Sequence, residues 1–267
     1  MAEKQANAYA QLDHPGILEV IFHPRKAIHP PSANPGVSDH DIPVADDCHI
    51  GARFHAGVGD GVNVLFFHGN GEIVPDYDDL GPVYNQMGIN LLAVDYRGYG
   101  QSTGLPTVSA MMEDCHSIYH YVREWLANNG RPGPLVAMGR SLGSASALEL
   151  ASSYGEDIDG LVIESGFAYT LPLLRLLGAR PPADAAGELD LGNLDKIGAY
   201  TGPTLVIHAQ YDHIIPFSDG QALYAARGAF RKRLLRIRDA DHNDILLQGF
   251  KEYMQALKGF TAWLATE

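Results

Sequence analysis

The sequence predicts an α/β fold in which one mostly parallel sheet is covered by helices on both faces. From Val62 onward, short and fully apolar segments alternate with longer amphipathic ones, as expected of buried parallel strands and their covering helices. A Gly-x-Ser-x-Gly motif at residues 139–143 lies between an apolar run and a stretch of small and apolar residues at helical spacing. The length of 267 residues suits one large core, so we expect a single domain over residues 1–267.

Composition and charge argue against several classes of protein. The formal net charge of −13 argues against a nucleic-acid or anionic-membrane partner. Cys48 and Cys115 form no metal or redox motif, and the 12 histidines match no metal-ligand spacing. No apolar run approaches the ~18 residues of a membrane span, and residues 1–16 lack an apolar signal region. We therefore expect a cytoplasmic protein without membrane anchor, metal or cofactor.

The first 60 residues are rich in Pro, His and Asp. Their apolar runs predict two strands, Ile17–Phe22 and Cys48–His55, on either side of a Pro-rich loop at residues 29–35. We expect these two strands to form a leading antiparallel hairpin.

The rest of the chain continues the alternation of strands and helices. Strands are predicted at Val62–Phe67, Ile89–Asp95, Leu135–Met138, Gly160–Glu164, Thr204–Ala209 and Leu234–Arg238. Helices are predicted at Asp76–Gln86, Ser109–Asn128, Leu142–Ser153, Ser218–Arg227 and Asp244–Leu264. Basic residues interleave with Leu and Ile in and before the last strand, which favours an edge strand with one solvated face over an anion site.

The Gly-x-Ser-x-Gly motif indicates a nucleophilic serine. Ser141 lies at a tight strand-to-helix turn, where Gly139 and Gly143 let the two backbones approach each other. The turn projects the hydroxyl from the sheet edge at a helix N-terminus, where negative charge is stabilised. A second match contains Ser102, but it follows its strand at a distance and precedes a Leu-Pro dipeptide, so no helix can begin there. We expect Ser141 to be the nucleophile.

A serine hydroxyl needs a base within hydrogen-bond reach, usually a histidine that a carboxylate orients. Asp212 and His242 each follow a predicted parallel strand, and the order Ser, Asp, His is one in which such triads occur. His208 lies inside an apolar strand and is interpreted as a core histidine, whereas His213 follows Asp212 too directly to be oriented by it. The alternative acids, Asp239 and Asp241, are interpreted as solvated loop carboxylates.

The oxyanion of an acyl-transfer reaction needs two backbone donors. One is expected to be the N–H of Leu142, directly after the nucleophile. Gly69 and Gly71 let the loop after the first parallel strand turn inward, so Asn70 N–H is the second expected donor. His68 is expected to fix this loop by hydrogen bonds. A phosphate-binding loop is disfavoured because no Gly-x-x-x-x-Gly-Lys is present.

The longest stretch without a place in the alternation is residues 166–199. Loops of this length in a compact domain are usually functional. Its Leu and aromatic residues precede a break at Pro181-Pro182, which predicts a short apolar helix as a small lid over the site. Phe167, Tyr169 and Leu173 are the expected substrate contacts. The alternative is a surface helix that packs its own apolar side.

Five stretches of the sequence resemble the α/β-hydrolase superfamily, and within it the small-cap branch of depalmitoylating thioesterases and serine-aminopeptidase-like esterases. They are residues 67–72 (FHGNGE), 95–104 (DYRGYGQSTG), 139–143 (GRSLG), 211–216 (YDHIIP) and 241–244 (DHND). The resemblance spans about residue 60 to the C-terminus. It implies an α/β-hydrolase fold with an eight-stranded sheet and a triad of Ser141, Asp212 and His242.

The resemblance also implies that residues 95–104 form a structural loop held by Asp95 and Arg97. Two departures from the family are visible. The strand before the acid has Ala209 and Gln210 where the family often has Gly, which leaves the triad intact. The N-terminal cysteine cluster that anchors membrane-bound depalmitoylating members is absent, so depalmitoylation of membrane proteins is not expected.

These observations predict a serine hydrolase without cofactor that cleaves a small-molecule carboxylic ester or thioester through an acyl-enzyme. One alternative keeps the triad but hydrolyses small peptides or amides, with Glu72 or Glu164 as anchor for a free amino group. Another is a ligand-binding protein on a hydrolase fold. A dehalogenase would need Asp at the position of Ser141, and the glycine motif of hydride-transfer enzymes does not follow the first parallel strand.

Overall fold

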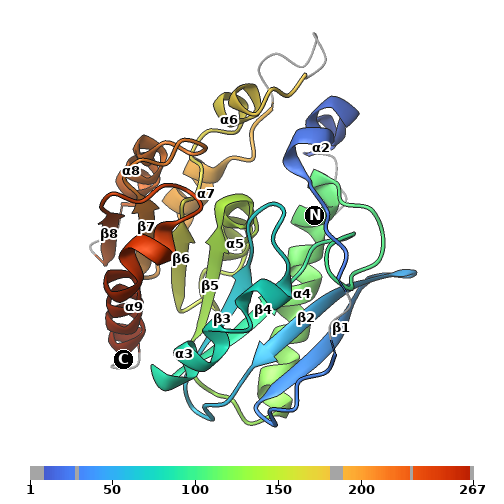
Figure 1. The fold of residues 1–267 in the computed structure, drawn as a ribbon, viewed down its shortest axis with the longest axis vertical. Coiled ribbons are helices and arrows are strands. Elements are labelled where there is room, and N and C mark those ends of the chain that lie inside the picture. Colours follow the sequence, from blue (N-terminus) through green and yellow to red (C-terminus); the bar gives the residue numbers. More distant parts are fainter. Residues whose placement is uncertain (1–8, 28–29, 181–188, 229–230, 265–267) are drawn as a thin grey trace.

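The computed structural model describes residues 9–27, 30–180, 189–228 and 231–264. Within these residues, eight strands form one sheet in the order β1-β2-β4-β3-β5-β6-β7-β8 (Figure 1). β1 pairs antiparallel with β2, and β2 with β4, whereas the other neighbours are parallel. The predicted α/β-hydrolase fold is thereby confirmed. Residues 1–8, position 29 at the start of the Pro-rich loop, and the predicted break at Pro181-Pro182 lie outside the described residues.

The strands are β1 Val37–Ala45, β2 Cys48–His55, β3 Val62–Phe67, β4 Ile89–Val94, β5 Leu135–Arg140, β6 Gly160–Glu164, β7 Thr204–Ala209 and β8 Lys232–Ile237. The α-helices are α2 Pro15–Ile21, α3 Leu80–Gln86, α4 Val108–Asn128, α5 Ser144–Ser153, α6 Thr170–Leu176, α7 Asn193–Ala199, α8 Phe217–Ala226 and α9 Ile245–Leu264. Short 3-10 turns are η1 Ala10–Asp13, η2 Val74–Tyr77 and η3 Ser141–Gly143. None of the helices in the described part of the chain is both long and apolar enough to span a bilayer.

The prediction of a first strand at Ile17–Phe22 is wrong, because this segment forms helix α2. The His14 ring accepts a hydrogen bond from the backbone N–H of Gly16, and Pro15 occupies the first turn, where it fits a helix. A short apolar run is compatible with either structure, so packing decides. The hairpin partner of β2 is instead β1, a polar edge strand with an irregular register at Pro43, which the alternation pattern did not reveal.

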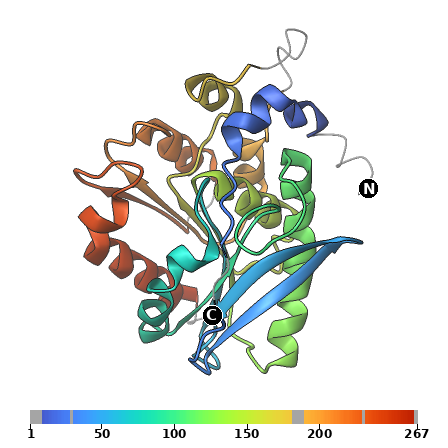
Figure 2. The same ribbon diagram turned by 45° about the vertical axis from the view of Figure 1, so that its right-hand side comes forward.

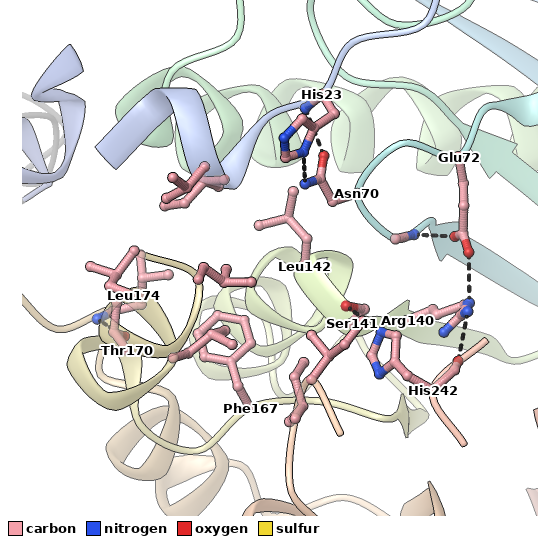
Figure 3. A pocket seen from close by; sticks show the side chains of 18 of the residues that line it. His23, Asn70, Glu72, Arg140, Ser141, Leu142, Phe167, Thr170, Leu174 and His242 are labelled. Atoms are coloured by element: carbon pink, nitrogen blue, oxygen red, sulfur yellow. Dashed lines mark hydrogen bonds and ion pairs between the residues drawn. The ribbon is translucent and has the colours of Figure 1, made fainter. Parts of the chain in front are cut away.

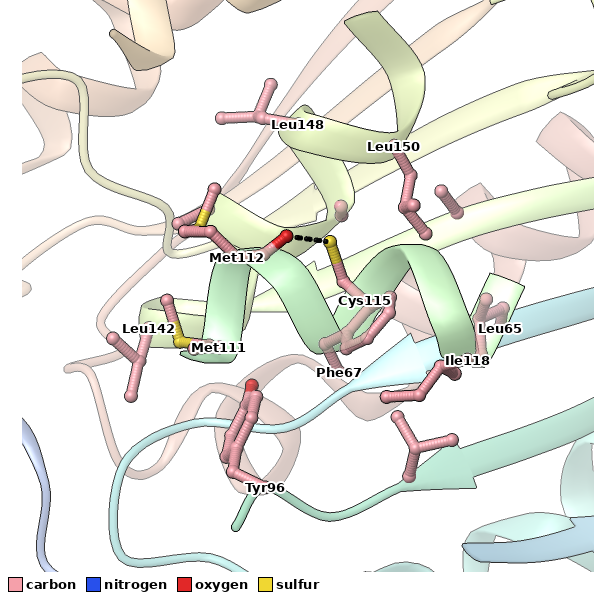
Figure 4. Close-up of a cluster of buried hydrophobic side chains, with 14 of the residues drawn as sticks. Leu65, Phe67, Tyr96, Met111, Met112, Cys115, Ile118, Leu142, Leu148 and Leu150 are labelled. Atoms are coloured by element: carbon pink, nitrogen blue, oxygen red, sulfur yellow. Dashed lines mark hydrogen bonds between the residues drawn. The ribbon is translucent and has the colours of Figure 1, made fainter. Parts of the chain in front are cut away.

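The sheet separates two layers of helices (Figures 1 and 2). One core packs the sheet against α4, α5, α7 and α8, and the other packs it against α3 and α9. On the first face, Met111, Met112, Cys115 and Ile118 of α4 lie against side chains of β3 and α5, and the Cys115 thiol donates to the carbonyl of Met112 (Figure 4). The face of α4 that builds this core also carries Met111, which lines the cavity described below.

Two predicted helices differ in detail from the observed ones. The segment predicted as one helix over Asp76–Gln86 is divided into η2 and α3, and the helix after the serine begins with the turn η3 before α5. α7 was not predicted. It packs against α5 and α8 and so belongs to a covering layer. Among the described residues of the predicted lid at 166–199, Leu191 and residues of α6 and its flanks line the cavity at Ser141.

Ser102, the serine of the second Gly-x-Ser-x-Gly match, has a structural role. Ser102 is buried, and its hydroxyl accepts a hydrogen bond from the Gly51 N–H at 2.9 Å. Asp95 accepts from the Val74 N–H at 3.0 Å, and Arg97 forms two hydrogen bonds of 2.6 and 2.7 Å with Asp114. The loop of residues 95–104 is therefore held as the family resemblance implied.

The turn at Ser141 is strained and crowded. Ser141 has a φ of 51°, in the left-handed region that side chains disfavour. A Cβ on Gly143 would lie 2.2 Å from the carbonyl oxygen of Phe67, and one on Gly139 would lie 2.2 Å from that of Gly143. Only glycines at these two positions let β3, β5 and the following helix approach so closely.

Replacing Gly143 with alanine is expected to lower the free energy of unfolding by about 3 kcal/mol, because the added methyl group collides with backbone that cannot move aside. Gly259→Ala is the matched control, since nothing lies within 4 Å of a Cβ placed at Gly259 in α9. This control should raise the free energy of unfolding by about 0.5 to 1 kcal/mol. Urea unfolding followed by circular dichroism measures both. Wild-type stability of the Gly143→Ala protein would contradict the close approach described here.

Candidate active site

Three polar side chains meet at the carboxyl edge of the sheet. His242 Nε2 lies 3.0 Å from Ser141 Oγ, and His242 Nδ1 lies 2.7 Å from Asp212 Oδ2. They follow β5, β7 and β8, and because parallel strands end at one edge, residues 101 and 30 positions apart are neighbours. All three are buried. The three residues predicted as a triad are thus brought together, and Figure 3 shows Ser141 beside His242.

Asp212 is fixed so that one oxygen is left for the imidazole. Its Oδ1 accepts hydrogen bonds from the N–H groups of Ile214 and Ile215 at 3.0 and 2.8 Å. Burial by itself would raise the pKa of Asp212, but the hydrogen bond and charge of His242 outweigh it and hold the pKa below its usual range. The carboxylate is therefore ionised and oriented toward His242 Nδ1.

The alternative residues do not contact His242. His208 is fully buried, its Nε2 donates to the Ile215 carbonyl at 2.8 Å, and burial lowers its pKa, as expected of a core histidine. His213 and Asp239 are exposed. Asp241 accepts from the N–H groups of the two residues at 243 and 244 and shapes the turn that carries His242.

The loop after β3 lies beside Ser141 because Phe67 of β3 pairs with Gly139 of β5. Both ring nitrogens of His68 are engaged, Nδ1 at 2.7 Å from the Gly69 carbonyl and Nε2 at 3.1 Å from Asp95. His68 therefore fixes the loop by hydrogen bonds, as expected. Asn70 and Leu142, the two predicted oxyanion donors, line the same cavity as Ser141.

Arg140, which the sequence did not single out, joins the loop after β3 to the loop after β8. Its Nη2 donates to the backbone carbonyl of His242 at 3.0 Å, and its Nε lies 2.9 Å from Glu72. Glu72 in turn accepts from the Gly69 N–H at 2.6 Å. The position of Arg140 directly before Ser141 in the Gly-x-Ser-x-Gly motif was the available signal. The sequence does not show, however, which residue pairs with Arg140. Figure 3 shows Arg140 between Glu72 and His242.

The two carboxylates near Arg140 differ in their pKa. Burial would raise the pKa of Glu72, but Arg140 and the Tyr77 hydroxyl outweigh it and lower the pKa. Glu164 is more deeply buried, and burial raises its pKa although Arg140 and Tyr253 partly offset this. Tyr253 donates to Glu164 at 2.5 Å. Glu72 is engaged by Arg140, Tyr77 and the Gly69 N–H, and Glu164 is buried, so neither is an accessible carboxylate for a substrate amino group.

An apolar cavity of about 260 Å³ opens at Ser141. Phe167 and Leu173 line it as predicted, but Tyr169 does not: it precedes α6 and is 46% exposed. The structure thus places Tyr169, one of the predicted substrate contacts, outside the cavity wall. The apolar wall includes Val20, Ile21, Val108, Met111, Leu142, Leu174, Leu177, Leu191, Ile214 and Ile215. The contribution of Val20 and Ile21 was missed because their segment was predicted as a strand. The described residues contain no group of three His, Cys, Asp or Glu side chains placed to hold a metal.

Comparison with known sequences finds related hydrolases. Residues 62–185 match the family model described as serine aminopeptidase, S33. Alpha/beta hydrolase domain-containing protein 17C of Xenopus tropicalis is 31% identical over 219 residues, covering 80% of this chain and 63% of that protein. Alpha/beta hydrolase domain-containing protein 17B of Homo sapiens is 30% identical over 208 residues, covering 74% and 66%. The chain thus spans somewhat less than two thirds of these relatives.

Solved structures share the fold at low sequence identity. An esterase of Pyrococcus furiosus superposes with a TM-score of 0.71 at 18% identity, covering 90% of this chain and 98% of that one. A monoacylglycerol lipase of Paleococcus ferrophilus gives a TM-score of 0.62 at 15% identity, covering 82% and 99%. At such identities the likeness concerns the architecture alone.

The opposite pKa directions of the two carboxylates predict different effects of removing their charge. Glu72→Gln should lower kcat/KM about 10- to 100-fold, because Arg140 loses its ionised partner and the loop of Gly69 shifts. It should also lower the free energy of unfolding by about 2 kcal/mol. Glu164→Gln mimics a neutral acid and should stay within about threefold of wild type. Ester kinetics and urea unfolding measure both effects. Equal losses in the two variants would contradict the assignment.

The acid side of the stability profile should depend on Asp212. Its folded pKa lies below the unfolded value of about 3.9, so its stabilisation is present above that pH and is lost as the pH falls through the folded pKa. Wild type should therefore exceed Asp212→Asn in free energy of unfolding at neutral pH, and the difference should shrink between about pH 5 and pH 3. Urea unfolding at stepped pH tests this. A difference that grows toward low pH would mean that the pKa is raised.

Proposed function

The chain belongs to the α/β-hydrolase superfamily, in its depalmitoylase-like branch, and from this we propose that it is a serine hydrolase that cleaves a carboxylic ester or thioester. The observation that carries the proposal is the pair of hydrogen bonds that links Ser141, His242 and an ionised Asp212. A serine becomes nucleophilic when a base within hydrogen-bond reach takes its proton and a carboxylate orients that base.

In the proposed reaction, Ser141 Oγ attacks the acyl carbon while His242 Nε2 takes the hydroxyl proton. The tetrahedral oxyanion accepts hydrogen bonds from the N–H groups of Asn70 and Leu142. His242 then gives its proton to the leaving alcohol or thiol, and the acyl group stays on Ser141. Water, deprotonated by His242, attacks the acyl-enzyme, and Ser141 regains its proton as the acid leaves. Asp212 keeps the imidazole in the tautomer with its proton on Nδ1.

The cavity supports a substrate with an apolar acyl group. Its wall is mainly Leu, Ile, Val and Phe, and it opens at the proposed nucleophile. Phe167 and Leu173 are the proposed acyl contacts among the residues chosen from sequence. From the sequence, we also propose that the substrate is a small molecule and that the protein is cytoplasmic.

Peptidase and binding-protein alternatives have less support. A free amino terminus would need an unpaired carboxylate, whereas Glu72 and Glu164 are both close to Arg140. A non-catalytic binding protein has no need for a hydrogen-bonded Ser, His and Asp. The ester or thioester proposal therefore accounts for more of the observed geometry.

The decisive experiment labels wild type and Ser141→Ala with a fluorophosphonate probe, read by intact mass, beside a p-nitrophenyl ester series from acetate upward. Wild type should gain one adduct and hydrolyse esters, and Ser141→Ala should do neither, because its nucleophile is gone. Asp212→Asn, which keeps the size of the side chain, should lower kcat about 10⁴-fold. A folded wild type without adduct or turnover would refute the proposal, and so would full activity of Ser141→Ala.

A further inference from the structure

The N-terminal segment crosses the pocket edge of the molecule, outside residues 62–185 that match the family model. Hydrogen bonds hold this segment, residues 9–27, to the rest of the molecule at several points. Tyr9 donates to Glu149 at 3.0 Å, and the N–H of Ser109 donates to Asp13 at 3.0 Å. Beyond α2, the backbone at residues 25–27 exchanges hydrogen bonds with Gly100, at 2.9 and 3.3 Å. These contacts place α2 at a defined position over the site.

α2 forms one wall of the cavity, and α6 forms the facing region. Val20 and Ile21 line the cavity from α2, while Leu173, Leu174 and Leu177 line it from α6 and its end. The two helices lie side by side at the top of the molecule in both ribbon views (Figures 1 and 2). The N–H of Arg180, after α6, donates to the carbonyl of residue 16 at 3.1 Å. The cover of the cavity therefore has two parts that come from distant segments of the chain.

The same segment also holds the loop of the proposed oxyanion donor. The backbone N–H of His23 donates to Asn70 Oδ1 at 2.8 Å, and the amide nitrogen of Asn70 lies 2.7 Å from His23 Nδ1. Tyr99 donates to the same Asn70 oxygen at 2.7 Å. Asn70 is thereby fixed by three hydrogen bonds, two of them with His23, which lies two positions after the end of α2. Figure 3 shows His23 and Asn70 facing each other beside Leu142.

We infer that α2 and His23 form the second half of the substrate site: Val20 and Ile21 bind the acyl chain and limit its length, and His23 positions Asn70. The inference rests on the proposed function and names its substrate class, an ester whose apolar acyl chain is longer than acetyl. The cavity of about 260 Å³ at Ser141 is walled mainly by Leu, Ile, Val and Phe, which suits such a chain.

The side chains of α2 and His23 are expected to affect catalysis in different ways. Val20 and Ile21 contact only the acyl chain, so they act on long substrates and leave acetate esters nearly unaffected. Each additional buried methylene should raise kcat/KM about fourfold until the cavity is full. His23 acts through Asn70 on the oxyanion, whose charge develops only in the transition state, so it affects kcat for every chain length.

Val20→Trp tests the wall, and Glu19→Trp is the matched control because Glu19 lies on the exposed side of α2. With p-nitrophenyl octanoate, kcat/KM of Val20→Trp should fall at least about tenfold, while the value for acetate should change less than about threefold. Glu19→Trp should keep the wild-type profile. Val20→Ala, which cannot clash, should move the optimum toward longer chains and guards against misfolding of the Trp variant.

His23→Ala tests the positioning of Asn70, with p-nitrophenyl acetate as substrate so that chain length plays no part. We expect kcat to fall about 10- to 100-fold with little change in KM, because the oxyanion donor loses its alignment. His23→Asn should restore most of kcat, since its side-chain oxygen can accept the hydrogen bond that Nδ1 accepts. A merely structural role would lower thermal stability in both variants without this pattern of loss and rescue.

The outcomes separate this inference from the proposed function. A wild type that hydrolyses esters while both Val20 variants keep its chain-length profile overturns the role of α2 and leaves the serine hydrolase intact. Unchanged kcat in His23→Ala overturns the positioning role. A folded wild type with neither turnover nor fluorophosphonate adduct overturns the proposed function, and this inference with it.

Discussion

The ion pair between Arg140 and Glu72 is the interaction on which the arrangement of the site depends. Arg140 ends β5 and directly precedes the strained Ser141, so the position of its backbone is set by the sheet. Its guanidinium is buried, and such a charge is tolerated only with ionised or hydrogen-bonding partners. Glu72 and the carbonyl of His242 supply them, and in doing so they join the loop after β3, which carries Asn70, to the loop after β8, which carries His242.

This pair also explains how a site made of loops is held rigidly. Side-chain hydrogen bonds join the loops after β3, β5 and β8 to one another. Glu72 accepts a hydrogen bond from the Gly69 N–H and also pairs with Arg140. This carboxylate therefore links the turn after β3 to the charged side chain at the end of β5. Glu164 borders the same guanidinium but with a raised pKa, which limits the negative charge that the buried cluster must carry.

The cover of the cavity combines segments with different constraints. The start of α6 is anchored, since Thr170 donates to Asp190 at 2.9 Å and the N–H of Ala168 donates to Asp219 at 2.9 Å. α2 is tied to α4 and to the loop of residues 95–104. The apolar cavity between them is bordered at one end by Ser141, His242 and the loop of Asn70. An apolar cavity with a few polar groups at one end is the usual form of a small-molecule site.

The sequence by itself determined the central strands and the three residues Ser141, Asp212 and His242. Buried parallel strands give unbroken apolar runs, and side chains just past their carboxyl ends must meet at one edge of the sheet. Only the tertiary structure decided that residues 15–21 form a helix, that Tyr169 lies outside the cavity, and that Arg140 pairs with Glu72. A short apolar run fits helix or strand equally, and partners 68 residues apart leave no local pattern, so long-range packing alone selects among these outcomes.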